Sequence, residues 1–325
     1  MSYKTGIAGS IGFAEETTWG THAVATRFYE ISSESLQQQI SRIESPALRQ
    51  NRPFTATDRW TPGTKSVSGD ISLEMRNKGM GLFLKQMLGT AAGPVTDGAG
   101  YQHTFTPGDL SGGQSLSAEI GRPFIDGTVK AYLYSGLKVS SWTLSNAVDG
   151  LLELQMSMDG KIEDTSGSLA GVSYPAADEM YTYMQGTVVI GGTTYPLNSW
   201  TLTGNNALKV DRYKINGSQY KLEQIVNAFR EYSGSVEMDF IDQTLYSDYV
   251  NGSLATITIT YQTTTTYDTA KPYKFVITLQ NCRFDGTTVN ITGPDVLTQT
   301  LPFKCLDDRT NPIVKFDYYT SDATP

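Results

Sequence analysis

A strand followed by a short helix occurs twice in this chain, and this recurrence constrains the fold more than any other feature. The first copy, residues 67–89, reads VSGDISLEMRNKGMGLFLKQMLG. Every second residue from Ile71 to Met75 is apolar, which is the pattern of a half-buried strand. The next apolar residues have helical spacing, with Asn77 as the expected N-cap and Gly89 as the expected stop.

The second copy spans residues 232–252 and reads YSGSVEMDFIDQTLYSDYVNG. Ser68-Gly69 recurs as Ser233-Gly234, 165 positions later, and Asp242 and Gly252 take the places of the cap and the stop. A strand, a cap and a helix that return in the same order indicate a duplicated domain.

Further strand patterns follow each copy in the same order. The alternating segments 116–120, 130–134 and 154–158 recur as 255–259, 275–279 and 301–305. The number of residues between matching positions of the two copies changes along the chain. It changes mainly because the first copy carries an additional Gly- and Pro-rich segment, 90–113, which we predict to be a loop. Length changes confined to loops are typical of duplicated domains that have diverged.

We therefore predict a mainly β fold with two tandem β-sandwich or split-barrel domains, each flanked by one short helix. The predicted divisions are an N-terminal arm (1–25), copy 1 (26–160), a linker (161–182), copy 2 (183–308) and a C-terminal tail (309–325). Residues 44–64 hold several arginines and prolines. Loops of this length are uncommon unless they have a function.

Charge and composition exclude several classes of protein. The net charge of −8 and the pI near 4.9 argue against a sequence-reading nucleic-acid binder, which would present a basic face. No apolar run approaches the length of a membrane span, and we identify no signal peptide at the N-terminus. The repeat aligns Cys282 and Cys305 with the apolar Leu137 and Met158, so we expect two buried free thiols.

Catalytic and metal-binding patterns are missing. With only two histidines, a Ser-His-Asp site is barely possible and a His-based metal site is implausible. We predict no enzyme activity, no metal and no cofactor.

The informative carboxylates lie at the polar positions of the strands. An ordinary solvated face and a functional acidic wall both remain open for them. These candidate acidic positions are Asp70, Glu74, Glu153, Glu237 and Asp239.

The chain resembles the major tail tube proteins of long-tailed, siphovirus-type bacteriophages. The resemblance rests on GSIGFAEETTWGT at 9–21, RQNRPF at 49–54, VSGDISLEM at 67–75 and the GLFLKQMLGT that follows. The resemblance covers about the first third of the chain. The rest of the chain is consistent with the family in its strand pattern and its repeat.

This resemblance implies a structural virion protein whose domains form stacked rings with a central channel for DNA ejection. A chain with two tube domains would form a pseudo-hexameric ring from three subunits. The five acidic positions would line the lumen, and segments 1–25, 44–64 and 90–113 would contact neighbouring rings. The implied partners are other copies of the chain, the tape measure, tail terminator and distal tail proteins, and DNA that passes without specific binding. Assembly would take place in the host cytoplasm, without a membrane.

A second hypothesis is a tandem β-sandwich binding module, such as an adhesin or a carbohydrate-binding virion protein. The many tyrosines, together with Trp142 and Trp200, support it. A binder would be stabilised by its ligand, whereas a tube protein would self-assemble without one.

Overall fold

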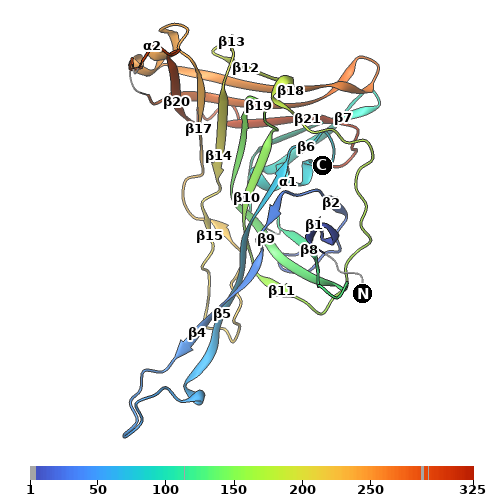
Figure 1. Ribbon diagram of the computed structural model, residues 1–325, viewed down its shortest axis with the longest axis vertical. Helices are drawn as coiled ribbons and strands as arrows, with labels where there is room; N and C mark the ends of the chain where they lie inside the picture. The colour runs from blue at the N-terminus through green and yellow to red at the C-terminus, as the bar shows by residue number, and fades with distance from the viewer. Residues whose placement is uncertain (1–4, 113, 287–288, 292) are drawn as a thin grey trace.

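The computed structural model describes residues 5–112, 114–286, 289–291 and 293–325. Strands dominate the architecture (Figure 1). A long hairpin projects from one end of the molecule, and the second helix lies at the other end. The predicted β class is therefore confirmed.

A central sheet runs along the long axis of the molecule (Figure 1). All neighbouring strands in it are antiparallel. Its order is β4 (Gln37–Glu44), β5 (Trp60–Glu74), β10 (Glu153–Gly160), β9 (Val129–Ala147), β14 (Ser199–Asn205), β17 (Glu231–Asp239) and β20 (Thr298–Cys305).

Two outer groups of strands cover one face of this sheet. The first group contains β2 (Arg27–Tyr29), β1 (Ser10–Glu15), β8 (Leu116–Pro123), the first part of β9, and β11 (Ile162–Asp164). The second contains β13 (Thr193–Tyr195), β12 (Gly186–Ile190), β18 (Leu254–Asp268), β19 (Lys271–Phe284), β21 (Val314–Thr320), β7 (Gly100–Pro107) and β6 (Gly89–Asp97). The shorter elements are β3 (Ser33–Glu34), β15 (Leu208–Lys209), β16 (Ile225–Val226) and the 3-10 turns Gly6–Ala8, Thr57–Arg59 and Tyr183–Gln185.

Both predicted helices are present, as α1 (Gly81–Leu88) and α2 (Thr244–Asn251). Gly89 and Gly252 end them in the left-handed conformation, as predicted. The predicted cap Asn77 is wrong, because α1 begins after Met80. The Asn77 side chain is buried, and its oxygen accepts a hydrogen bond from the Glu179 amide.

One hydrophobic core lies between the central sheet and the outer strands. Trp142 of the central β9 packs edge-on against Phe316 of the outer β21, with ring centroids 5.7 Å apart. Phe13 of β1 packs in the same way against Phe83 of α1, at 5.0 Å. The core is continuous through the molecule, so the two halves of the chain are not independently packed.

Three segments predicted as an arm, a tail and a loop contain strands. Residues 10–15 of the predicted N-terminal arm pair with β2 and β8, because Ile11 and Phe13 enter the core. The predicted tail contains β21, whose Val314, Phe316 and Tyr318 are buried. The predicted loop 90–113 contains the hairpin β6–β7, which pairs with β21. Residues 1–4 and 113 lie outside the described residues.

The strand pairing repeats along the chain. The ladder β4–β5–β10–β9 has a counterpart in β14–β17–β20–β19. Ile120 lies opposite Tyr132, and Ile259 lies opposite Ile277, as the sequence alignment of the copies requires.

The alignment of the last strand is wrong by two residues. Met156 lies opposite Ile71, and Leu301 lies opposite Val236. The pairing therefore matches Leu301 to Met156, and not to Leu154. Two amphipathic strands with the same period can be aligned in several registers, so the sequence alone did not fix this one.

Candidate functional site on the polar face of the central sheet

Side chains alternate between the two faces of the central sheet, apart from bulges in the β9–β10 and β4–β5 pairs. One face carries buried apolar residues such as Ile71, Met156, Leu144, Leu202 and Val236. The other face, which we call the polar face, carries Ser, Thr, Gln, Asn and acidic residues at almost every position. Its members on β5, β10, β9, β14, β17 and β20 include Ser68, Asp70, Ser72, Glu74, Glu153, Gln155, Ser157, Ser141, Thr143, Ser145, Ser199, Thr201, Thr203, Asn205, Glu231, Ser233, Ser235, Glu237, Asp239, Thr298, Thr300 and Lys304.

All five predicted acidic positions lie on the polar face. Glu74 and Glu153 are directly opposite each other on β5 and β10, an arrangement that is unfavourable for like charges. Arg76 offsets part of this repulsion, with its Nη2 3.5 Å from a Glu74 carboxylate oxygen. Asp70 accepts a 2.6 Å hydrogen bond from the hydroxyl of Ser157.

The other two acidic residues lie on β17, four strands from β5 and three from β10. Glu237 accepts a 3.4 Å hydrogen bond from Ser199, and Asp239 accepts one of 3.3 Å from the Asn198 amide. Lys304 is the one cation in the polar-face set given above, and it is paired with Glu231 at 2.7 Å. The polar face thus presents exposed acceptor groups and almost no positive charge.

Sequence reasoning missed the uncharged middle of this surface. On β9 and β14 the polar face carries hydroxyl groups that bond across the strands, for example Thr143 to Thr203 at 3.1 Å. Thr201 and Ser235 make a similar contact at 3.0 Å. The repeated Ser-Trp-Thr-Leu segments, 141–144 and 199–202, were the available signal. They lie on neighbouring antiparallel strands, with Leu144 opposite Leu202, and form the seam between the two halves of the sheet.

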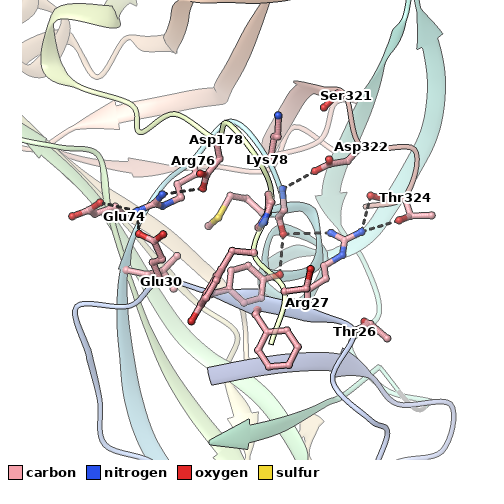
Figure 2. Close-up of a pocket in the computed structure, with 18 of the residues that line it drawn as sticks. Thr26, Arg27, Glu30, Glu74, Arg76, Lys78, Asp178, Ser321, Asp322 and Thr324 are labelled. Carbon is pink, nitrogen blue, oxygen red and sulfur yellow. Dashed lines mark hydrogen bonds and ion pairs between the residues drawn. The ribbon is translucent and has the colours of Figure 1, made fainter. Parts of the chain in front are cut away.

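A second candidate is the pocket of about 460 Å³ beside α1 (Figure 2). Its charged groups are already used to fasten one part of the chain to another. Arg76 binds Asp178 at 2.9 Å and Glu30 at 2.7 Å. Arg27 donates to Thr324 at 2.8 Å, and Asp322 accepts from the Gly79 amide at 2.6 Å. The last two contacts hold the C-terminal residues against β2 and the turn before α1, so we assign the pocket a structural role.

The two histidines are also engaged in structural contacts. His22 lies 3.2 Å from Glu119, and buried His103 lies 2.7 Å from the carbonyl oxygen of Asp322. Within the described ranges, no group of three or more His, Cys, Asp or Glu side chains is arranged to hold a metal ion. Cys282 and Cys305 are buried free thiols on paired strands, with their sulfur atoms 3.7 Å apart.

Comparison with known families identifies the class of protein. The chain belongs to the phage tail tube protein family, whose model matches residues 6–305. The protein is therefore a structural component of the virion tail. The search of curated proteins gave no significant match. In the described part of the chain, no helix is both long enough and apolar enough to cross a membrane.

Proposed function

We propose that copies of this chain form rings that stack into the tail tube, with the polar face of the central sheet lining the DNA channel. The observation that carries this proposal is the charge of that face. A channel rich in carboxylates and hydroxyls repels the phosphate backbone, so DNA passes without being held. A basic wall would bind DNA through counterion release. Asp70, Glu74, Glu153, Glu237 and Asp239 would face the lumen.

The pairing pattern supports a duplicated tube domain and a ring of three subunits. Contacts between the layers occupy matching positions in the two halves, although they use different side chains. Arg122 of β8 donates to Glu34 of β3, and in the second half Tyr261 of β18 accepts from Trp200 of β14. Three chains would thus supply six similar sheet units, and a head-to-tail interface with closed rotation would give a ring.

Free strand edges would join the subunits. Among the described residues, β4 pairs only with β5 and leaves its outer edge open. An open edge normally favours aggregation, and a neighbour in a ring would satisfy it. Assembly would occur in the host cytoplasm together with the tape measure, tail terminator and distal tail proteins.

Electron microscopy tests this proposal directly. Negative-stain images of the purified protein at rising concentration should show rings or tubes with a central hole and threefold symmetry. Sixfold averages from six separate chains would contradict the trimer, and compact monomers at every concentration and salt would contradict the tube.

A charge variant tests the assignment of the lumen. Tubes carrying Glu153→Lys and Gln155→Lys should retain short DNA fragments at low salt and release them as salt rises. Wild-type tubes, and tubes with the outer-surface change Thr128→Lys, should not retain DNA. Equal behaviour of both variants would place the polar face away from the channel.

The binding-module hypothesis loses the support of its two tryptophans. Trp142 is 1% exposed and Trp200 is 4% exposed, so neither presents an open ring face on the surface for a sugar to stack on. Both rings contribute to the core instead.

A further inference from the structure

The hairpin between β4 and β5 is an apolar and basic projection. We call residues 40–64 the arm, which extends beyond the rest of the molecule at one end (Figure 1). It contains four arginines against two carboxylates. Its tip is closed by a hydrogen bond from the Arg52 amide to the Arg49 carbonyl, at 3.1 Å.

Large apolar side chains lie exposed beside that tip. Leu48 is fully exposed and Phe54 is 85% exposed. Exposed apolar groups of this size mark contact surfaces when they gather in one place. Within a single chain, the arm therefore presents surface that has no partner.

A pocket of about 340 Å³ lies near the opposite end of the molecule, where β12, β13 and the start of β14 meet. Its lining includes Tyr195, Leu197, Trp200 and Tyr261. The indole of Trp200 donates a 2.9 Å hydrogen bond to the Tyr261 hydroxyl, which fixes both rings. The rest of the wall combines apolar side chains such as Val148 and Val188 with polar ones such as Asn146 and Thr187. Its aromatic and aliphatic groups can pack against an entering aromatic side chain. Val148, 58% exposed, lies in this lining.

The surroundings of the pocket are acidic. Burial, together with the negative charges of Asp242 and Asp248, raises the pKa of Tyr195. The segments 146–151, 183–200 and 239–253 contain four aspartates and no lysine or arginine. A pocket with acidic surroundings near one end of the molecule and a basic arm at the other end thus carry complementary charges.

We propose that the arm of one copy docks into this pocket on the next copy along the tube. Phe54 would enter the pocket, and Arg49 and Arg52 would lie against Asp242 and Asp248. This inference rests on the proposed tube, and it names the surface that receives the arm. Stacking along the strand direction would keep the polar faces of successive rings in line. Complementary charge would set the direction of stacking.

Substitutions in the arm test the docking. In full-length protein, Phe54→Ser should raise the concentration at which tubes appear at least tenfold, and the pair Arg49→Asp with Arg52→Asp should act similarly. Phe124→Ser, which removes an equally large side chain from the turn after β8, is the matched control and should leave assembly unchanged. Adding Asp242→Arg and Asp248→Arg to the arm charge reversal should restore tubes.

A cross-link locates the contact. A Phe54→Cys, Val148→Cys chain should form a ladder of disulfide-linked species after mild oxidation of tubes, and neither single variant should. If Phe54→Ser assembles like the wild type and the double-cysteine chain gives no ladder, the proposed docking is wrong. The proposed tube would be unaffected by that result. No rings or tubes from the wild-type chain would contradict the proposed function and the docking together.

Discussion

The arm and the loop between β14 and β17 occupy matching places in the two halves of the central sheet, yet only one of them projects. The arm connects β4 to β5, and residues 206–230 connect β14 to β17. The second connection, which we call the folded loop, packs back onto the sheet. Lys65 at the base of the arm donates its amide to the Gln219 carbonyl, so the folded loop also supports the arm.

Buried cations hold the folded loop in place. The ammonium of Lys221 is 2.6 Å from Asp159 on β10, and the side chain of Lys221 is 1% exposed. Lys138 on β9 binds Glu223 at 2.7 Å. Gln224 donates to the carbonyl of Asp159 at 2.9 Å and is fully buried.

Burial shifts the pKa values of the side chains that hold the folded loop. It lowers the pKa of Lys138 and of Lys221, and it raises the pKa of Asp159. The arm has no comparable anchor among its described residues, since its side chains are mostly exposed. The comparison teaches that the same sheet position can serve the fold or an interface, depending on a few buried polar contacts.

The largest expected effect comes from breaking the Lys221 anchor. Lys221→Met leaves Asp159 as an uncompensated buried charge, so the free energy of unfolding should fall by about 3–5 kcal/mol. Urea denaturation measures this loss. Lys214→Met, on the exposed part of the same loop, is the control and should change little. Equal losses from both variants would show that the buried pair does not anchor the loop.

Two glycines at matching positions allow a test of the duplication. A Cβ at Gly69 would overlap the carbonyl oxygen of Ser35, and a Cβ at Gly234 would overlap that of Thr201. Gly69→Ala and Gly234→Ala should therefore each lower stability by about 1–3 kcal/mol through overpacking. Thermal unfolding compares them, with Gly171→Ala, which has open space, as the control. A loss in one half only would break the equivalence of the two strands.

The buried Lys138 should give a dependence of stability on pH. Because burial lowers its pKa from 10.5, the unfolded chain binds more protons than the folded chain between the lowered value and 10.5. Stability should therefore rise with pH across this window, relative to Lys138→Met. The measurement is the difference in melting temperature between the two proteins at each pH from 8 to 10.5. Because both proteins share all other titrating groups, the contributions of those groups cancel in this difference. A constant difference would show that the pKa of Lys138 is not lowered.

The smallest expected effect is in the arm. Phe54→Ser should change the free energy of unfolding of the unassembled protein by less than about 0.5 kcal/mol, because the side chain has no packing to lose. Chemical denaturation at a concentration below assembly measures it. A loss above about 1 kcal/mol would mean that the arm folds back in solution, which would remove the contrast with the folded loop.

Local pattern predicted much of this fold. The strand and helix of each half, both glycine stops and the shared face of all five acidic residues follow from the periods 2 and 3.6 and from backbone chemistry. The strands β1 and β7 were missed because they lie in Gly- and Thr-rich sequence. The strand β21 was missed although Val314, Phe316 and Tyr318 alternate with polar or less buried residues. Phe13, Phe105 and Phe316 of these three strands become buried only when distant segments meet.

The sequence by itself determined the class of the protein, the recurring strand and helix of each half and the acidic character of one strand face. Only the tertiary structure decided which strands are neighbours, because pairing depends on contacts between residues far apart in the chain. It placed the hairpin β6–β7 of the first half beside β21. It also left the arm free while Asp159 and Lys138 hold the folded loop, a difference that depends on buried charge meeting its partner across the fold.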